Sequence, residues 1–292
     1  MVVSLVVGAA GGVGLAVARN LVDQGHEVIG TVLNSAEEAV LRSEVPQLKI
    51  VHHVNLDDAD NVFSSVREIV SGLDYLNNVV ICAAISPLGI VALSPISMFR
   101  RTLEINTISQ ISIYQAVIQK LRDSKGRLLF ISSISGKFGL PLVGAYTASK
   151  HALEGVADVI RQEEAAFGVE VILVEPGGLH TPMVEAQLQQ VKSLIAGLTP
   201  EKESQYGHIY NGFKNVVEGL CLGRSGSTAS QVAAVVAEGL TAAAPETRYV
   251  VGEDAKGLMA ARHVMSDRVF DELLANALFA TASSTAGLDS PG

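Results

Sequence analysis

A tyrosine and a lysine in the middle of the chain have the spacing of a proton-transfer pair. Tyr146 and Lys150, in Tyr-Thr-Ala-Ser-Lys, are four residues apart and share one face of a predicted helix. Tyrosine, with an ordinary pKa of about 10, is a poor base at neutral pH, but a nearby ammonium favours the phenolate and lowers that pKa. Tyr146 could then accept a proton from an alcohol or donate one to a carbonyl. Lys150 could also hydrogen-bond the ribose of a nucleotide cofactor.

Ser133 is the third residue that could take part in this chemistry. It lies thirteen residues before Tyr146, in Ile131-Ser-Ser-Ile-Ser-Gly136, at the end of a predicted strand. In open parallel sheets, ligands bind outside the carboxyl ends of the strands. The Ser133 hydroxyl could therefore hold the oxygen on which Tyr146 acts, whereas Ser132 and Ser135 are interpreted as ordinary loop residues.

A glycine-rich turn, Gly8-Ala-Ala-Gly-Gly-Val-Gly14, follows the first predicted strand and leads into a helix. Glycines at such a turn permit the tight bend, the approach of a pyrophosphate to the backbone, and close helix packing. The N–H groups and partial positive charge of the helix N-terminus also favour phosphates. The turn therefore predicts a dinucleotide site. Gly8, Gly12 and Gly14 fit G-x-x-x-G-x-G, while Gly8, Gly11 and Gly14 fit G-x-x-G-x-x-G, and the motif alone does not choose between these spacings.

The end of the second predicted strand leaves the choice between NAD and NADP open. A carboxylate there would bind the ribose 2′-hydroxyl of NAD, whereas a basic residue would suit the 2′-phosphate of NADP. This strand ends Gly30-Thr-Val-Leu-Asn-Ser35 and has neither. Asn34 and Ser35 could hydrogen-bond either cofactor, so we predict NAD or NADP without a preference.

These residues need a scaffold in which strand ends converge, and the sequence predicts one. Short β-branched runs alternate with longer helical stretches, which indicates a parallel sheet covered on both faces. Right-handed connections between the strands then give a doubly wound α/β fold. The predicted strands are Val2–Val7, Glu27–Val32, Leu48–His53, Asn78–Ala83, Arg127–Ser132, Glu170–Glu175 and Thr247–Val251. The helical stretches include Gly14–Gln24, Pro95–Asp123, Ala145–Phe167 and Ser230–Ala243.

Residues 182–228 break this alternation, with helical pieces, several glycines and no clear strand. An insertion late in a doubly wound fold lies near the carboxyl ends of the strands, and long insertions there are often lids. We expect a helical lid over an apolar pocket, although its apolar residues could equally pack the lid helices together. We predict one domain over residues 1–280 and a flexible tail over 281–292.

Composition narrows the class of protein. The 292 residues are 48% hydrophobic and 17% charged, which suffices for a large core, and the net charge of −9 with no basic cluster argues against nucleic acid and anionic membrane as partners. The uncharged run from Met1 to Ala18 lacks the preceding basic residues of a signal peptide. Two cysteines make no disulfide framework, and His and Cys show no metal-site spacing. We therefore expect a cytoplasmic protein without a catalytic metal.

Taken together, Gly8, Gly12, Gly14, Ser133, Tyr146 and Lys150 resemble the signature of the classical short-chain dehydrogenase/reductase family. The resemblance is close over residues 2–182 and looser beyond. It implies a seven-stranded Rossmann sheet and hydride transfer between a nicotinamide cofactor and an alcohol or ketone. By this resemblance, Asn106 anchors a water that links Lys150 to solvent, and Thr181, which ends Pro176-Gly-Gly-Leu-His-Thr181, holds the nicotinamide carboxamide. Tyr206-Gly, Arg248–Lys256 and Ser266–Asp271 resemble the hydroxysteroid and retinol dehydrogenase branch, which implies a hydrophobic substrate.

The predicted site has a catalytic set and a cofactor-binding set. The catalytic residues are Ser133, Tyr146, Lys150 and Asn106. The cofactor-binding residues are Gly8, Gly11, Gly12, Val13, Gly14, Asn34, Ser35, Asn55, Leu56, Ala83, Tyr146, Lys150, Pro176, Gly177 and Thr181. Three departures from the family pattern affect scaffold and adenine contacts: Val7 replaces a threonine, Asn55 replaces an aspartate, and Ile81-Cys-Ala-Ala84 replaces Asn-Asn-Ala-Gly, so other residues must brace the sheet.

Three hypotheses about function are compatible with these motifs. The leading one is an NAD(P)-dependent oxidoreductase that interconverts a secondary alcohol and a ketone. An extended-branch epimerase or dehydratase, suggested by Gly8, Gly11 and Gly14, would hold NAD tightly with no net cofactor turnover. A nucleotide-sensing protein would bind the cofactor without catalysis, and Tyr146→Phe would then change nothing measurable. By resemblance, the chain forms a homodimer or homotetramer through Pro95–Asp123 and Ala145–Phe167.

Overall fold

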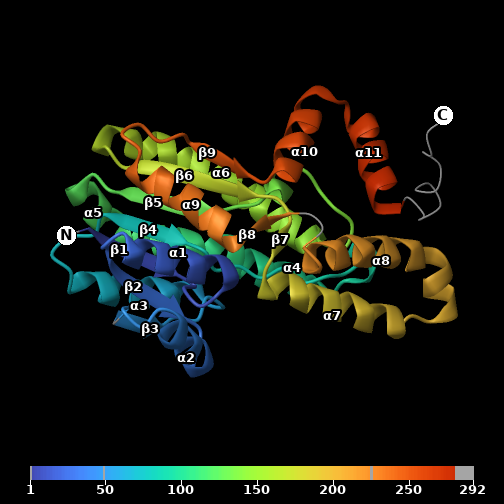
Figure 1. The fold of residues 1–292 in the computed structure, drawn as a ribbon, viewed down its shortest axis with the longest axis horizontal. Helices are drawn as coiled ribbons and strands as arrows, with labels where there is room; N and C mark the ends of the chain where they lie inside the picture. The colour runs from blue at the N-terminus through green and yellow to red at the C-terminus, as the bar shows by residue number, and fades with distance from the viewer. Residues whose placement is uncertain (1, 49, 224–225, 280–292) are drawn as a thin grey trace, which may run out of the picture.

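The computed structural model describes residues 2–48, 50–223 and 226–279. Its centre is a seven-stranded parallel sheet with the strand order β3-β2-β1-β4-β5-β6-β9 (Figure 1). The strands are β1 (Val3–Val7), β2 (Glu27–Val32), β3 (Ile50–His53), β4 (Asn78–Ile81), β5 (Arg127–Ile131), β6 (Glu170–Pro176) and β9 (Arg248–Val251). This is the doubly wound sheet predicted from the sequence, and each strand begins and ends within two residues of its predicted range.

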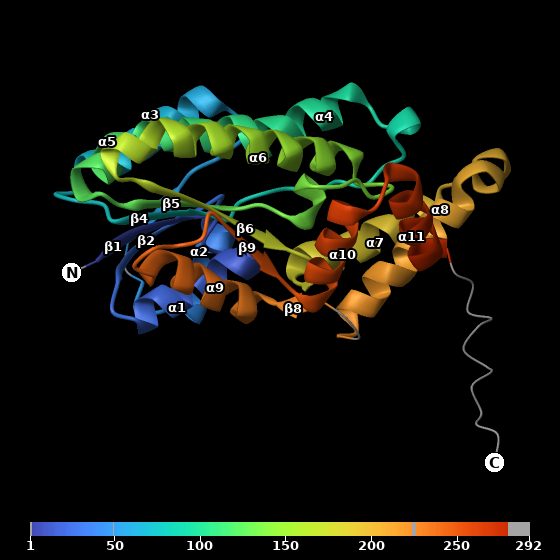
Figure 2. The same ribbon diagram turned by 90° about the horizontal axis from the view of Figure 1, so that it is seen from above.

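Helices cover both faces of the sheet. Figure 2 shows α3, α5 and α6 along one face and α1 and α9 along the other. Their bounds are α1 (Gly12–Asp23), α3 (Ala59–Ser71), α5 (Ser109–Ser124), α6 (Gly144–Glu164) and α9 (Ala229–Thr241). Two shorter helices, α2 (Ser35–Glu44) and α4 (Ile96–Leu103), lie between them in the chain. The single helix predicted over Pro95–Asp123 consists of α4 and α5 joined by a π-helical turn, Glu104–Ile108.

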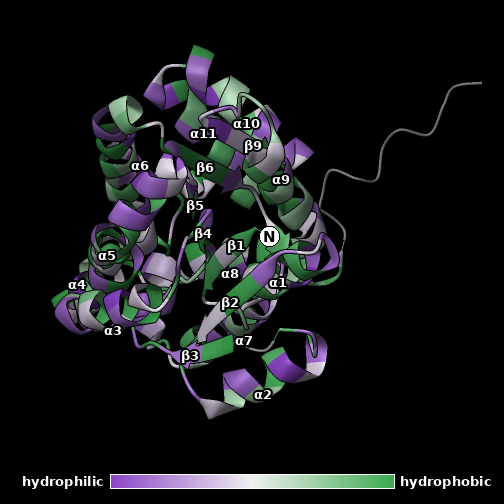
Figure 3. Cartoon of the chain, turned by 90° about the vertical axis from the view of Figure 1, so that its left-hand side faces the viewer, coloured by the Kyte–Doolittle hydropathy of each residue, from purple (hydrophilic) through white to green (hydrophobic). Residues whose placement is uncertain are grey.

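The sheet separates two hydrophobic cores, because successive residues in a strand point to opposite faces. In β1, Leu5 packs in the core with α3, α5 and α6, whereas Val6 packs in the core with α1 and α9. Val79 and Val80 repeat this division in β4. Burial on both faces explains why these strands are continuous apolar runs in the sequence. Figure 3 shows the surrounding helices with mixed hydrophilic and hydrophobic segments, as expected for helices that face both core and solvent.

A helical hairpin projects beyond the carboxyl edge of the sheet (Figure 1). It consists of α7 (Pro182–Ala196) and α8 (Pro200–Cys221), which confirms the helices predicted in residues 182–228. Two short strands that the sequence did not indicate, β7 (Leu179–His180) and β8 (Ser227–Thr228), pair at its base.

The last described helices, α10 (Glu253–Val264) and α11 (Asp267–Phe279), were not predicted. The second of them, α11, packs against α8 and so extends the hairpin into a larger helical cover. Within the described ranges, no helix is both long and apolar enough to cross a bilayer. The tail predicted at 281–292 lies outside the described residues.

Candidate active site

A cavity of about 630 Å³ lies at the carboxyl ends of the strands, between the glycine turn and the helical cover. This volume is in the range that cofactors and small molecules occupy. Ser133, Tyr146 and Lys150 line the cavity together with the glycine turn, so the structure brings together the residues that the sequence analysis selected for chemistry and for dinucleotide binding. Among the described residues, no group of three or more His, Cys, Asp or Glu side chains is arranged to hold a metal ion.

Steric constraints in the glycine turn distinguish the two overlapping motifs. Gly8 has a φ of +77°, and a Cβ there would lie 2.8 Å from the Cβ of Ala83. A Cβ on Gly14 would lie 2.0 Å from the carbonyl oxygen of Gly8, and one on Gly12 would lie 3.0 Å from the Cβ of Thr181. A Cβ on Gly11 would meet only the Gly8 oxygen, at 3.5 Å, which is an ordinary contact. The constrained glycines are therefore Gly8, Gly12 and Gly14, the spacing of the classical branch.

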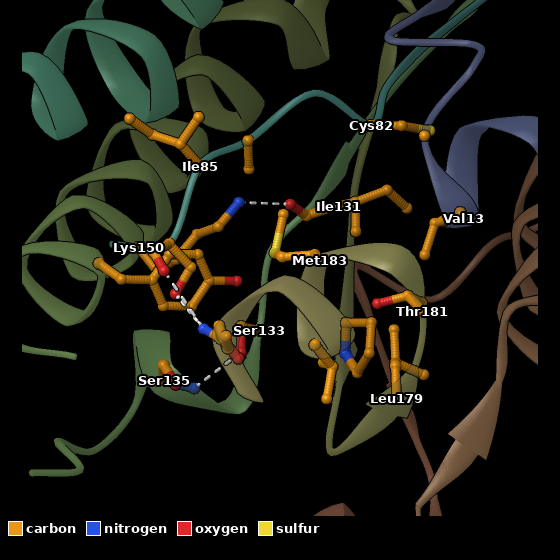
Figure 4. Close-up of a pocket in the computed structure, with 18 of the residues that line it drawn as sticks. Val13, Cys82, Ile85, Ile131, Ser133, Ser135, Lys150, Leu179, Thr181 and Met183 are labelled. Carbon is orange, nitrogen blue, oxygen red and sulfur yellow. Dashed lines mark hydrogen bonds between the residues drawn. The ribbon is translucent and has the colours of Figure 1, made fainter. Parts of the chain in front are cut away.

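Two helix N-termini face the cavity without side-chain caps. Gly11, which has no side chain, is the N-cap of α1, and Thr181 is the N-cap of α7 but its hydroxyl makes no capping hydrogen bond. The first-turn N–H groups of α1 are available to an anion, whereas α7 begins with Pro182, which has no N–H, and its Val184 N–H donates to the Thr181 carbonyl oxygen. Figure 4 shows Thr181 and Val13 on the same wall. This arrangement fits a pyrophosphate at α1, with the Thr181 hydroxyl available to a neighbouring polar group.

Ser133 and the helix α6 lie against each other at the end of β5. Ser133 begins a short 3₁₀ turn, η3 (Ile134–Gly136), and its Oγ accepts a hydrogen bond from the Ser135 N–H at 3.1 Å (Figure 4). Lys150 is 1% exposed, and its Nζ donates to the Ile131 carbonyl oxygen at 2.7 Å. The same Nζ lies 5.7 Å from the centre of the Tyr146 ring. The tyrosine, lysine and serine therefore occupy one wall of the cavity.

Burial dominates the protonation of this group. It raises the pKa of Tyr146 to about 12, although a hydrogen bond with Ser133 acts in the opposite direction. Burial lowers the pKa of Lys150 to about 8, against the charges of Glu154 and Cys82. The sequence-based expectation that the lysine lowers the tyrosine pKa is therefore wrong for this structure, because desolvation prevails and the ammonium binds the Ile131 carbonyl. At neutral pH Tyr146 is a protonated phenol and can donate a proton.

Asn106 lies outside the cavity wall, in the π-helical turn, and is fully buried. Its Nδ2 donates to the Ile85 carbonyl at 2.8 Å and to Ser149 Oγ at 3.0 Å, while its Oδ1 accepts from the Ile85 N–H at 2.8 Å. Gln110 Nε2 adds a hydrogen bond to the Ala83 carbonyl at 3.1 Å. Asn106 and Gln110 thus brace the chain after β4, where the Ile81-Cys-Ala-Ala84 departure required other polar partners.

The two residues expected beyond β2 lie away from the cavity wall. Asn34 and Ser35 do not line the cavity, because Asn34 Oδ1 caps α2 by accepting from the N–H groups of Ala36 and Glu37, both at 3.0 Å. The carboxylate of Glu37 lines the wall instead and accepts from the Leu33 N–H at 2.8 Å. Glu37 was not predicted, because it lies in the first turn of α2 and not directly at the end of the strand. The other expected cofactor-binding positions, Gly8, Gly11, Gly12, Val13, Gly14, Asn55, Leu56, Ala83, Tyr146, Lys150, Pro176, Gly177 and Thr181, all line the cavity.

The opposite end of the cavity is apolar and comes from the helical cover. Its lining includes Met183, Val184, Phe213, Val216, Val217, Leu220, Leu258, Leu274, Ala277 and Leu278. The last four belong to α10 and α11, which the sequence analysis did not assign to the site. The spacing of Leu274, Ala277 and Leu278, which places them on one helix face, is the signal that could have identified them.

Comparison with known proteins agrees with this arrangement. The family model described as short chain dehydrogenase matches residues 2–192. The NADPH-dependent 3-dehydrocapnine reductase of Ornithobacterium rhinotracheale is 29% identical over 277 residues, which cover 92% of this chain and 95% of that protein. Retinol dehydrogenase 5 of Mus musculus is 32% identical over 179 residues, which cover 60% of this chain and 56% of that protein.

Solved structures show the same fold. A short-chain dehydrogenase from Streptomyces avermitilis has a TM-score of 0.74 and 22% sequence identity, with 94% of this chain and 96% of that chain covered. The family model spans more than half of the sequence, and the strand order and glycine geometry agree with it. The chain therefore belongs to the classical short-chain dehydrogenase/reductase family and is an NAD(P)-dependent oxidoreductase acting on alcohol or ketone groups.

Proposed function

We propose that the protein reduces a hydrophobic ketone to a secondary alcohol, with Tyr146 as proton donor, Ser133 as holder of the substrate oxygen, and Lys150 and Asn106 in support. The observation that carries this proposal is the position of the partly buried Tyr146 side chain beside Ser133, in a cavity continuous with the glycine turn. A proton donor and a second hydroxyl at one point can bind a single carbonyl oxygen from two directions.

The residues present fit a nicotinamide dinucleotide. Gly8 and Gly14 let the turn pack tightly against Ala83 and against itself, since a Cβ at either position would collide with those atoms, and the N-terminus of α1 that this turn presents would hold the pyrophosphate. Lys150 would hold the nicotinamide ribose, and Thr181 the carboxamide. When bound, the reduced cofactor supplies the hydride.

The protonation states favour the reductive direction. With a pKa raised to about 12, Tyr146 keeps its proton at neutral pH and can release it to a developing alkoxide. Lys150, with a pKa of about 8, is mostly protonated at pH 7 and stabilises the phenolate that the transfer leaves. Asn106, whose side chain is bonded to Ile85 and Ser149, holds α6 against the strand exit and so keeps this pair in place.

The apolar cover supports a hydrophobic substrate. Phe213, Val217 and Leu220 from α8 and Leu274 and Leu278 from α11 line the same cavity. Such a wall gives binding energy in proportion to the apolar area that a ligand buries, at about 25 cal/mol per Å². The relative named retinol dehydrogenase 5 is consistent with this substrate class.

The charge at the other end of the cavity favours NADH over NADPH. Glu37 presents a carboxylate near the end of β2, and Arg101, a cation in the same region, is bound by Asp57 at 2.7 Å. A 2′-phosphate would bring about two further negative charges toward Glu37, which is unfavourable. The name of the NADPH-dependent relative points the other way, so both cofactors must be tested.

The decisive experiment follows the loss of reduced-nicotinamide absorbance with steroid, retinoid and small aliphatic ketones, with NADH and NADPH run separately. Tyr146→Phe should reduce turnover by a factor of about 10² to 10⁴, which is the usual contribution of a general acid, with cofactor binding retained. Tyr114→Phe is the matched control, because Tyr114 donates to Glu164 outside the cavity. Equal turnover in wild type and Tyr146→Phe would refute the proposal, and tightly held NAD that is never consumed would favour an epimerase.

A further inference from the structure

A buried glutamate lies one helical turn beyond Lys150. Tyr146, Lys150 and Glu154 follow one another at intervals of four residues and therefore share one face of α6. The Glu154 side chain is 6% exposed, and the chemistry described above does not use it. A carboxylate withdrawn from water in this way is costly unless cations and hydrogen-bond donors surround it.

The partners of Glu154 lie at the two ends of the loop that carries Ser133. Its Oε1 accepts a hydrogen bond from Ser132 Oγ at 2.5 Å, and its Oε2 accepts one from Lys137 Nζ at 2.7 Å. Residues 132–137 form a single short segment with Ser133 inside it and η3 at its centre. One carboxylate therefore binds both ends of the catalytic serine loop to the helix that carries the tyrosine.

The loop lies very close to α6 at this point. A Cβ on Gly136 would lie 2.9 Å from Glu154 Cγ, 3.2 Å from the Lys150 carbonyl oxygen and 3.2 Å from Ser132 Oγ. The absence of a side chain at Gly136 thus lets the loop reach the carboxylate. At these distances the loop is already in contact with α6 and cannot move closer to it.

A second layer of charge surrounds this contact. Arg248 of β9 donates to Glu154 Oε2 at 3.1 Å and to Asp158 Oδ1 at 2.8 Å, and its Nε lies 3.1 Å from Oε1 of the buried Glu175 on β6. Arg161 pairs with Asp158 at the outer edge. The cluster joins α6, β6, β9 and the serine loop, so Glu154 is held from several elements and is not free to follow a moving loop.

We propose that Glu154 is a positioning residue for the reaction, which clamps both ends of the segment Ser132–Lys137 to α6 and thereby holds Ser133 at hydrogen-bond distance from Tyr146. This inference rests on the proposed function of Ser133 and Tyr146. Without the clamp, the serine loop keeps its backbone bond to β6 and its apolar contacts but loses the side-chain links to α6, so the two hydroxyls no longer converge on one substrate oxygen. A misplacement of about 1 Å costs on the order of 100-fold in rate.

Three variants test the clamp by separating its two ends. Glu154→Gln keeps an oxygen that can accept from Ser132 but loses the charge that binds Lys137. Ser132→Ala removes the first link alone, and Lys137→Met the second. We expect Glu154→Gln to lower kcat by about 10- to 100-fold while KM and the cofactor Kd change by less than about threefold, because the clamp acts on geometry at the reacting atoms.

Glu164→Gln is the matched control, because Glu164 is also a fully buried glutamate on α6. Its partners are Arg122 and Tyr114, and none of the three lines the cavity. Both variants break a buried ion pair, so both should lower the Tm. Only Glu154→Gln should lower kcat, and an equal loss of kcat in the two variants would reduce Glu154 to a structural residue.

The Ser133→Ala background gives the sharpest readout. If Glu154 acts by holding Ser133, then Glu154→Gln in that background should cause less than about a threefold further loss of kcat. A full 10- to 100-fold loss on top of Ser133→Ala would overturn the inference. Unchanged turnover in both Ser133→Ala and Tyr146→Phe would instead refute the proposed function, so the two failures are distinguishable.

Discussion

The protonation of Lys150 predicts how the reductive rate depends on pH. Burial lowers the pKa of this lysine to about 8, and the neighbouring Glu154 and Cys82 act in the opposite direction. The pKa of Tyr146 and that of Cys82 are both raised to about 12, so neither group changes its charge between pH 6 and 10. The lysine is therefore the group of this set that titrates where the assay is run.

The size of the effect follows from that pKa. At pH 7 about nine-tenths of the enzyme carries a protonated Lys150, at pH 8 about half, and at pH 9 about one-tenth. Because the ammonium stabilises the phenolate left by proton transfer, kcat for ketone reduction should fall about tenfold per pH unit above pH 8. The assay is kcat at saturating ketone and reduced cofactor from pH 6 to 10, with circular dichroism at each pH to show that the fold is intact.

Lys150→Arg is the control for this assignment. Arginine stays protonated throughout the range, so the inflection near pH 8 should vanish even if the longer side chain lowers the absolute rate. An inflection that persists in Lys150→Arg would assign the titration to another group. A flat profile in the wild type would refute the reasoning that buried Lys150 has a lowered pKa.

Two further predictions concern stability. Gly14→Ala should lower the free energy of unfolding by about 1–3 kcal/mol or more, because the new Cβ would lie 2.0 Å from the Gly8 oxygen. Gly11→Ala should change the free energy of unfolding by less than about 0.5 kcal/mol. Urea unfolding without cofactor compares the two variants, and equal losses would contradict the steric assignment. Burial and the charge of Glu154 raise the pKa of Glu175 from 4.5 to about 7, so the folded chain binds more protons than the unfolded chain in that window and loses stability as pH rises through it. Glu175→Gln cannot titrate, and its Tm relative to wild type should therefore rise between pH 5 and 8; a difference that stays constant or falls would exclude this linkage.

The strands, and the meeting of Ser133, Tyr146 and Lys150 at one cavity, could be predicted from the sequence because their signals are local. A strand buried on both faces is a continuous apolar run, and β1, β4 and β5 were each identified in this way. Tyr146 and Lys150 needed only the period of a helix to place them on one face. Ser133 needed only the rule that parallel strands end at a common edge, which brings it to the same cavity.

The residues that the sequence analysis missed depend on contacts between elements that are distant in the chain. The helices α10 and α11 follow the last strand. Helix α11 contacts α8, and its buried Phe270 and Leu274 pack with Ile134 and Phe138 from the segment after β5. Asn34 was expected at the cofactor because of its position after β2, but the start of α2 uses its side chain as a cap. An asparagine at a strand end is compatible in sequence with a cofactor contact and with a helix cap. Only the position of the helix that follows shows that Asn34 makes the cap.

The pKa values show the same limit for electrostatics. A tyrosine and a lysine on one helix face suggest a lowered phenol pKa, since the pairwise charge effect is visible in the spacing. Burial acts on the same phenol with the opposite sign, and its size depends on how completely α6 is covered by the loop after β5 and by the helices α7 and α8. The sequence therefore predicted a candidate proton carrier but not its protonation state, and the proposal of a reductive direction depends on the burial that the cover provides.

Ser132 is the clearest case of a role that spacing cannot show. In the sequence it resembles any polar loop residue beside Ser133. Its role is visible only in the structure, where its hydroxyl donates a hydrogen bond to the Glu154 carboxylate that also binds Lys137. That contact depends on three elements that are distant in the sequence. Helix α6 must place Glu154 beside the loop after β5, and β9 must bring Arg248 to the same carboxylate. Gly136 must also lack a side chain, so that the loop can approach α6. If the reaction needs the hydroxyls of Ser133 and Tyr146 at one point, as we propose, then the precision of the site depends on this buried cluster as much as on the motif residues. Variants in the cluster should therefore change the rate without changing which substrates bind.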